Sequence, residues 1–515
     1  MLYVFLSLLL FIAQPNFLLR LPSGQFKMAK KQLNICFVSS EITPFAKTGG
    51  LADVSGALGK YIRKHGHDIR LVMPLYSNID LFKYDFHKVG FAQHCEIHFG
   101  MRTLFYDMWT AKLPDSDTAV YFVHCPEMYN RGSLYTDDAD ESIRFALLSR
   151  AAIELCQRMN WSPDIFHIND WQTALTPVYL KALYAWDGLF GNTKTVITIH
   201  NIGYQGRFSS DKINDLQLAA YHNYFDAHDL YNGSINFLKT GLLQSDKLST
   251  VSPTYAREIQ TQEYGEVLDG ILRMRSGDLR GILNGVDYEE WDPKTDKLIP
   301  FNYSLKAISG KTKNKKALLD RLGLTHNKDV PLVGMITRLV SQKGLDLFEN
   351  VVDSVLAKYD MRLVVLGSGD EKYERYFYYL QLNFPEKVVF YQGYDYPLSH
   401  QIEAGSDIFL MPSKYEPCGL NQIYSLKYGT VPVVRKTGGL ADTVEAYDWE
   451  SQQGTGFMFE NYSKDGFRWA FEHALQTYRH KQAWKKLVLD GMKKDFSWDK
   501  QVIEYLKLYR EMVTD

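Results

Sequence analysis

The feature that most constrains the fold is a regular alternation of short apolar runs with amphipathic stretches. From Leu33 onward, runs of four or five apolar or β-branched residues are separated by segments with helical periodicity, such as 143–159. Uninterrupted runs of this length are typical of strands buried on both faces, and intervening helices are typical of βαβ units. The pattern predicts a parallel sheet covered by helices, with strands in the first half at 34–38, 69–73, 164–168 and 195–199.

The alternation pauses once and then restarts. Residues 291–314 are polar and broken by proline and glycine, and after Lys315 apolar runs return at 332–336, 363–366, 388–390, 408–411 and 431–434. A chain of 515 residues is long enough for two cored domains. We therefore expect an α/β protein with two Rossmann-like, doubly wound domains facing each other across a cleft, where the strands' carboxyl ends meet. The expected domains are 28–284 and 285–495, followed by an amphipathic helix at 496–515.

Residues 1–27 are expected to be an extension that precedes the folded chain. The apolar run Leu2–Ala13 is too short to span a bilayer as a helix, and no positive segment precedes it as in a signal peptide. Met28 leads through a short polar segment directly into the first predicted strand. We therefore interpret Met28 as the native start, with a signal peptide as the alternative, and sequencing of the native N-terminus distinguishes the two.

Charge and cysteine content exclude several classes of function. The 58 basic and 60 acidic residues nearly balance, so no global field favours nucleic acid or a membrane surface. The five cysteines form no CxxC pair, which argues against a disulfide framework and a zinc site. No HxxxH motif or acidic loop pair is present. We therefore expect no nucleic-acid or membrane partner, no metal, no cofactor and a cytoplasmic location.

A glycine loop, Lys47-Thr48-Gly49-Gly50, lies between a predicted strand and a predicted helix. Two glycines there allow backbone amides to approach an anion, the helix N-terminus adds a positive dipole, and Lys47 adds a full charge. A tight turn without a ligand is the alternative interpretation, because short glycine motifs are weak signals. The segment nearly repeats at 436–443, and we expect this second copy to be mainly structural.

Polar residues also follow several other predicted strands. Arg338 and Lys343 follow one strand of the second half, where two cations suit a diphosphate that gains charge as it leaves; solvated surface cations are the alternative. Glu416 follows another strand and could accept hydrogen bonds from sugar hydroxyls or cap a helix. His200 and Asp170 follow strands of the first half. Several such residues at one sheet edge favour a functional site over isolated structural roles.

Taken together, these motifs resemble the bacterial glycogen synthase and plant starch synthase family, which are retaining glucosyltransferases with the GT-B architecture of two Rossmann-like domains. The resemblance extends from about Leu33 to the end of the chain. Seven motifs occur in the family's order, and this makes the resemblance more specific than any one of them: KTGGLADV (47–54), Asp-Trp (170–171), IHNIGYQG (199–206), ILNGVD (282–287), TRLVSQKG (337–344), YEPCGL (415–420) and KTGGLADT (436–443).

The resemblance implies a role for each matching residue. Residues implied to act in catalysis are His200 near the transferred glucose, Asp170 beside it, the diphosphate-binding pair Arg338 and Lys343, and Glu416, which holds glucose hydroxyls. Residues implied to bind substrate are Lys47, Gly49, Gly50, Asp53, Asn284, Cys418, Gly419, Leu420 and Tyr394, the last by stacking on the nucleobase. Small departures from the family pattern are Asn421, where many members have threonine, and HIND in place of HAHD at 167–170.

The implied reaction is transfer of glucose, with retention, from ADP-glucose to the non-reducing end of glycogen or another α-1,4-glucan. Two alternatives stay open. One is a related GT-B transferase that uses UDP-glucose or a non-glucan acceptor, because Tyr394 could stack on adenine or uracil alike. The other is a catalytically silent protein that binds glucan or sugar nucleotide, although the full set of cations and acids argues against lost activity. A phosphorylase would need a pyridoxal lysine and a much longer chain.

Overall fold

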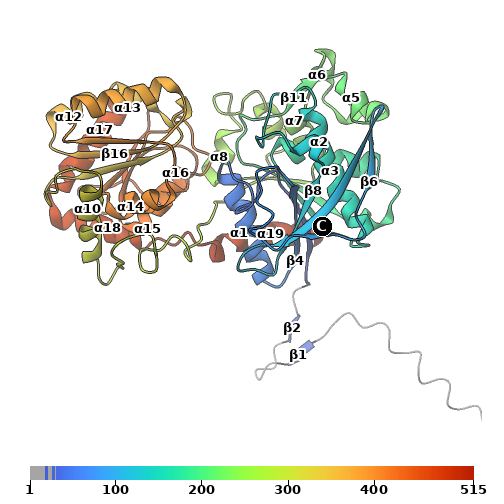
Figure 1. Cartoon of the computed structure of the whole chain (residues 1–515), viewed down its shortest axis with the longest axis horizontal. Helices are drawn as coiled ribbons and strands as arrows, with labels where there is room; N and C mark the ends of the chain where they lie inside the picture. The colour runs from blue at the N-terminus through green and yellow to red at the C-terminus, as the bar shows by residue number, and fades with distance from the viewer. Residues whose placement is uncertain (1–17, 21–25, 29–30, 515) are drawn as a thin grey trace, which may run out of the picture.

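Two sheets form the framework of the chain, which the computed structural model describes for residues 18–20, 26–28 and 31–514 (Figure 1). The first sheet has ten strands in the order β14-β13-β10-β9-β3-β4-β8-β7-β5, with β6 beside β7. Its parallel strands are β3 (Asn34–Val38), β4 (Asp68–Pro74), β8 (Ala119–His124), β9 (Ile165–Asn169), β10 (Lys194–Ile199), β13 (Lys247–Thr250) and β14 (Leu279–Gly281).

One edge of the first sheet is an antiparallel extension that the apolar runs do not predict. It consists of β5 (His87–Lys88), β6 (Cys95–Phe99) and the long strand β7 (Arg102–Lys112), which pairs antiparallel with β8. Buried and exposed positions alternate along β6 and through much of β7. Such alternation is typical of a sheet with only one covered face, so these strands lack the continuous apolar signal of the others.

The second sheet has six strands in the order β17-β16-β15-β18-β19-β20, and all neighbouring strands are parallel. These are β15 (Leu332–Ile336), β16 (Arg362–Gly367), β17 (Val388–Gln392), β18 (Ile408–Met411), β19 (Val431–Arg435) and β20 (Phe457–Phe459). Every apolar run predicted after Lys315 coincides with one of them. A separate two-stranded sheet, β11 (Arg207–Ser209) with β12 (Ser234–Asn236), belongs to the first unit.

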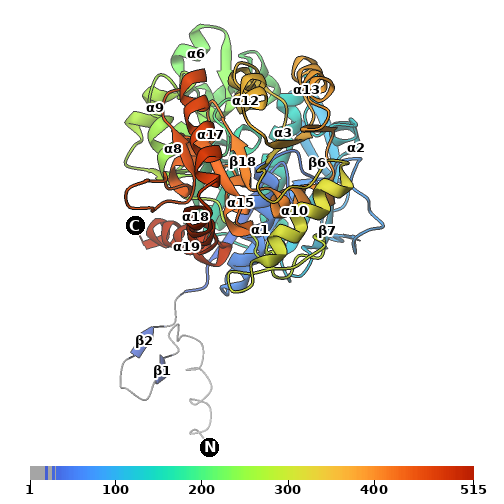
Figure 2. The same ribbon diagram turned by 90° about the vertical axis from the view of Figure 1, so that its left-hand side faces the viewer.

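Helices cover both sheets (Figures 1 and 2). Those of the first unit are α1 (Gly50–Lys64), α2 (Pro126–Tyr129), α3 (Glu141–Arg158), α4 (Thr176–Ala182), α5 (Lys212–Asp215), α6 (Ala227–Tyr231), α7 (Phe237–Gln244), α8 (Pro253–Glu258) and α9 (Asp269–Met274). Those of the second unit are α10 (Ser309–Arg321), α11 (Leu345–Glu349), α12 (Val352–Lys358), α13 (Glu371–Asn383), α14 (Tyr396–Gly405), α15 (Asn421–Tyr428), α16 (Gly438–Thr443), α17 (Lys464–Tyr478) and α18 (Lys481–Met492).

The chain passes between the two units twice, and the two passages lie side by side. After β14 the chain enters the second unit, where Val286 and Trp291 are buried in the core. The return passage lies against Val286, whose amide donates to the Phe496 carbonyl at 2.8 Å, and whose carbonyl accepts from the Trp498 amide at 3.3 Å. The final helix α19 (Trp498–Thr514) then packs on the first unit beside α1, with Tyr505 fully buried (Figure 2). The sequence does not indicate which unit this helix joins.

The N-terminal segment is described only in part. β1 (Leu18–Arg20) pairs antiparallel with β2 (Phe26–Met28), and residues 1–17 and 21–25 of the predicted extension lie outside the described residues. Among the helices that the structure describes, none has the length and apolar character that crossing a membrane requires.

Candidate active site

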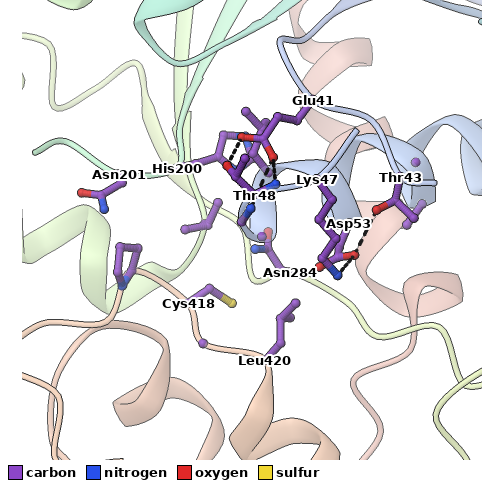
Figure 3. Close-up of a pocket in the computed structure, with 18 of the residues that line it drawn as sticks. Glu41, Thr43, Lys47, Thr48, Asp53, His200, Asn201, Asn284, Cys418 and Leu420 are labelled. Carbon is purple, nitrogen blue, oxygen red and sulfur yellow. Dashed lines mark hydrogen bonds and ion pairs between the residues drawn. The ribbon is translucent and has the colours of Figure 1, made fainter. Parts of the chain in front are cut away.

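A cleft of about 1180 Å³ lies between the two units and is lined by residues of both (Figure 3). This volume exceeds that of ordinary ligand pockets, so the cleft has room for a large ligand or for two ligands. The structure brings all of the predicted site residues to it: His200, Asp170, Arg338, Lys343, Glu416, Lys47, Gly49, Gly50, Asp53, Asn284, Tyr394, Cys418, Gly419 and Leu420. The carboxyl ends of the parallel strands place them there, because residues that follow such strands share one edge of a sheet.

The first glycine loop holds a carboxylate of the chain itself. Glu41, only 3% exposed, accepts hydrogen bonds from the Thr48 hydroxyl at 2.6 Å, from the Thr48 and Gly49 amides and from the Tyr135 hydroxyl (Figure 3). The two loop amides therefore already have an acceptor, and the positive charge that the loop offers a ligand is that of Lys47. Sequence reasoning missed Glu41, although it follows a predicted strand as Asp170 and His200 do.

Lys47, the first residue of this loop, forms an ion pair with one acidic residue. Its Nζ lies 2.7 Å from Asp53 Oδ1, and the Thr43 hydroxyl donates to the same oxygen at 3.3 Å (Figure 3). Asp53 belongs to the first turn of α1, where a negative charge is favoured by the helix dipole. The Lys47 side chain remains about half exposed, so its ammonium is both oriented by Asp53 and open to the cleft.

The opposite wall carries a partly buried ion pair between two loops of the second unit. Lys343 Nζ lies 2.7 Å from Glu416 Oε2 and 3.0 Å from Oε1, and the Ser413 hydroxyl donates to the same carboxylate at 3.0 Å. The loops approach closely because Gly344 is left-handed (φ +72°), and a Cβ there would lie 1.9 Å from the Pro412 carbonyl oxygen. Arg338 is exposed on the same wall, and its guanidinium has no hydrogen-bond or ion-pair partner among the described residues.

His200 and Asp170 occupy adjacent strand ends of the first unit. His200 Nε2 lies 2.9 Å from Asn169 Oδ1, and the His200 amide donates to Asp170 Oδ1 at 2.7 Å. Burial lowers the pKa of His200 to about 3, so the ring is neutral near pH 7 and serves as a hydrogen-bonding group. Asp170 has a left-handed backbone (φ +53°), which is uncommon outside glycine and recurs at functional sites.

Three further predicted residues, Cys418, Asn284 and Tyr394, also line the cleft. Burial raises the pKa of the Cys418 thiol to about 12, so this side chain is not a thiolate nucleophile. The Asn284 Oδ1 atom is buried without a hydrogen-bond partner among the described residues, which fits an acceptor reserved for a ligand hydroxyl. On the wall of the second unit, Tyr394 is 67% exposed and presents a free ring to the cleft.

The second copy of the glycine motif lies outside the cleft and joins the two units. Glu258 of α8 accepts from the Thr437 hydroxyl at 2.9 Å and from the Gly438 amide at 3.0 Å. Thr254 donates through its amide and hydroxyl to Asp442 at 2.8 and 2.7 Å. Each copy of the motif thus holds a glutamate carboxylate, but only the second receives it from the other unit. Its lysine, Lys436, forms a surface ion pair with Glu460.

One group of potential metal ligands lies elsewhere in the described part of the chain, around the start of α6. Asp226, His228 and Asp229 are close enough to share an ion. Lys239 Nζ lies 2.8 and 2.9 Å from the two carboxylates. The lysine supplies the positive charge there, and none of the three residues lines the cleft.

Comparison with known proteins assigns both units. The model of the starch synthase catalytic domain matches residues 34–274, and the model of glycosyl transferases group 1 matches residues 319–487. The glycogen synthase of Thermotoga maritima is 46% identical over 486 residues, which cover 93% of this chain and 99% of that protein. The glycogen synthase of Geotalea daltonii is 44% identical over 485 residues, covering 93% of this chain and 98% of that protein.

Solved structures agree. The catalytic domain of starch synthase IV from Arabidopsis thaliana, bound to ADP and acarbose, superposes with a TM-score of 0.87 at 34% identity, over 94% of this chain and all of that one. Sucrose-phosphate synthase from Thermosynechococcus elongatus shares the fold, with a TM-score of 0.60 at 16% identity over 94% of this chain and all of that one. The predicted GT-B fold is therefore confirmed. The chain belongs to the glycogen synthase and starch synthase family of GT-B glycosyltransferases and has glycogen synthase function.

Proposed function

We propose that the chain transfers glucose from ADP-glucose to the non-reducing end of an α-1,4-glucan, with retention at the anomeric carbon. The observation that carries this proposal is the placement of three cations from both units on one cleft: Lys47 on one wall, and Arg338 and Lys343 on the other. Such a set suits a diphosphate, whose negative charge grows as it leaves. ADP as the nucleotide is supported by the starch synthase IV structure, which is described as bound to ADP.

In this proposal the bond between glucose and diphosphate breaks through an oxocarbenium-like state. The cations stabilise the leaving diphosphate, whose phosphate oxygen takes the proton of the acceptor hydroxyl, so attack from the same face gives retention. The thiol of Cys418 is protonated and the Glu416 carboxylate is engaged by Lys343, so neither is free to act as a covalent nucleophile. Glu416, His200 and Asn284 position the glucose hydroxyls, and positioning with fixed charge is the main source of rate acceleration.

The donor and the linkage are tested with the full chain and labelled ADP-glucose or UDP-glucose, using glycogen and maltotriose as acceptors. We expect incorporation from ADP-glucose, an unchanged rate in EDTA, and release of the label as maltose by an exo-acting β-amylase. Incorporation from UDP-glucose alone would identify a related transferase instead. Glucan binding without transfer from either donor would identify a silent binding protein.

The two glycine motifs offer a matched pair of variants. Lys47→Ala removes a cleft cation and is expected to raise the KM for ADP-glucose on the order of tenfold, the usual weight of a charge-assisted hydrogen bond. Lys436→Ala removes the equivalent lysine of the second motif, which pairs with Glu460 at the surface, and is expected to leave kinetics within twofold. Steady-state kinetics with varied ADP-glucose measure both, and equal effects of the two substitutions would contradict the assignment of Lys47.

Asp170 predicts a pH-dependent stability. Burial raises its pKa from 3.8 to about 7, although the amides of His200 and Asn201 favour its charged form. Between these values the folded chain retains a proton that the unfolded chain has released, so this residue's contribution to stability falls as the pH rises from about 4 to 7. The full loss is about 4 kcal/mol.

We compare the melting temperature at pH 8 with that at pH 5 in the two proteins. The difference, pH 8 minus pH 5, is expected to be more positive in Asp170→Asn than in the wild type. Glu403, whose pKa burial raises to about 8, and His200, whose pKa burial lowers, are present in both proteins and cancel in the comparison. Scanning calorimetry at the two pH values measures the difference. Parallel behaviour of the two proteins would show that Asp170 does not titrate in this range.

A further inference from the structure

A second, smaller cavity lies between the two units, outside the cleft. It has a volume of about 170 Å³ and takes its walls from both units, including Glu263, Tyr264 and Glu266 of the first and Tyr415, Arg435 and Tyr462 of the second. We call it the seam pocket. A polar cavity of this volume can hold several water molecules, so it has room for a small ring of a ligand.

Arg435 organises the aromatic rings of the seam pocket. It is 8% exposed, and its guanidinium donates to the Tyr264 hydroxyl at 3.0 Å and to the Lys414 carbonyl. Its Cζ atom lies 5.2 Å from the centre of the Tyr462 ring. One buried cation thus fixes a tyrosine from each unit, and flat rings fixed in this way suit the apolar face of a sugar. The hydroxyls help to hold the rings, because Tyr264 accepts from Arg435 and Tyr462 donates to Asp346.

The charges of the seam pocket balance. Arg435 and Lys414 supply two positive charges, and Glu263 and Glu266 supply two negative ones. A phosphate or nucleotide would meet carboxylates as well as cations in the seam pocket. Paired donors and acceptors around aromatic rings favour a neutral ligand with many hydroxyl groups.

The wall of the seam pocket at Glu266 is strained. Glu266 and Val267 are both left-handed, with φ of +48° and +65°. A β-branched residue such as Val267 rarely adopts this conformation, because it costs on the order of 1 kcal/mol or more. Residues in such conformations are often found at ligand sites. Gln205 holds the segment by donating from Nε2 to the Glu266 carbonyl at 2.9 Å. This hydrogen bond helps to hold an otherwise unfavourable backbone conformation next to the seam pocket.

The seam pocket and the cleft share two loops. Gly203 and Tyr415 line the seam pocket, whereas the neighbouring Tyr204 and Glu416 line the cleft. A ligand in the seam pocket therefore contacts Tyr415, which is adjacent in sequence to Glu416, the residue assigned to the glucose hydroxyls. Because its walls come from both units, such a ligand also favours the arrangement of the units that forms it.

We propose that the seam pocket binds one glucosyl unit of an α-glucan, separately from the chain end that is extended in the cleft. The proposal rests on the proposed function for the identity of the glucan. A glycogen particle presents many chain ends, so one chain can occupy the seam pocket while another is extended, which raises the effective concentration of acceptor ends. A short acceptor such as maltotriose has no second end to contribute.

Kinetics of full-length variants test the proposal. Tyr264→Ala and Tyr462→Ala are expected to raise the KM for glycogen about tenfold, while the kcat with saturating maltotriose and the KM for ADP-glucose stay within twofold. Tyr264→Phe, which keeps the ring, is expected to retain most of the affinity. Tyr231→Ala, which removes an exposed tyrosine of α6 outside both cavities, is the control. An unchanged KM for glycogen in both alanine variants, or a parallel loss with maltotriose, would overturn the proposal.

Binding without the donor separates this proposal from the proposed function. Electrophoresis through gels that contain glycogen measures glucan binding even if the chain does not use ADP-glucose. We expect glycogen to retard the wild type and Tyr231→Ala equally, and Tyr264→Ala and Tyr462→Ala much less. Equal retardation of all four proteins, with melting temperatures unchanged, would show that the seam pocket holds no glucan, whatever the donor assay gives.

Discussion

Lys343→Ala is expected to lower kcat/KM by 10²-fold or more with the fold retained. Lys343 lies on the cleft beside Arg338, and a preorganised charge aimed at a leaving group is typically worth about 2.7–4 kcal/mol in the transition state. The substitution also leaves the Glu416 carboxylate, which is 6% exposed, with the Ser413 hydroxyl as its remaining side-chain partner. The loss of rate therefore has two causes. The diphosphate loses the positive charge of Lys343, and the Glu416 carboxylate that binds the sugar loses its orientation.

Steady-state kinetics with ADP-glucose and glycogen measure this effect, and circular dichroism shows whether the fold is retained. Lys343→Arg is the informative companion, because it keeps the charge but replaces a compact ammonium by a planar guanidinium. We expect it to recover part of the lost rate. Turnover of Lys343→Ala within tenfold of the wild type would refute the assignment of this residue to the diphosphate.

Glu416→Ala is expected to reduce turnover on the order of 10²-fold while leaving the chain folded. The carboxylate is oriented by Lys343 and by Ser413, so its removal deletes an oriented acceptor for glucose hydroxyls. Lys343 is 18% exposed on its side chain and loses its partner, which costs less than the about 3–5 kcal/mol of a fully buried pair. Full activity in Glu416→Ala would contradict its assignment to the sugar.

The double variant Lys343→Ala/Glu416→Ala separates a joint role from two independent ones. If the ion pair acts as a unit, the double variant loses much less than the product of the two single losses. If lysine and glutamate act independently, the losses in kcat/KM multiply. The kcat/KM values of the wild type, both single variants and the double variant decide between these outcomes.

The central parallel strands of both sheets and several residues at the cleft were predictable because they depend on local signals, whereas Asp53, Asn284 and Tyr394 were implied only by the family resemblance. Uninterrupted apolar runs mark buried parallel strands, and residues directly after such strands collect at one sheet edge. The antiparallel strand β7 lacked this signal because much of it alternates buried and exposed positions. Its existence depends on a sheet edge that only the folded chain provides.

Partnerships across the chain were not predictable. The sequence around Glu41 does not indicate its hydrogen bond with Tyr135, which lies 94 residues away in the chain. Likewise, Glu258 is an ordinary helical residue until α16 of the other unit is placed against it. The helix α19 packs on the first unit through Tyr505 and Tyr509, which are buried there. Any apolar surface could bury these side chains, so the sequence does not indicate which unit they contact. Long-range pairing of this kind comes from geometry, which periodicity does not encode.

The two adjacent passages between the units limit how the units can move. Because the segments at Val286 and Ser497 run side by side and are joined by backbone hydrogen bonds, we expect them to act together as one hinge. Sliding or twisting of one unit against the other would stretch one of the two segments. Rotation about such a hinge changes the distance of Lys47 from Arg338 and Lys343, which belong to one unit and move together.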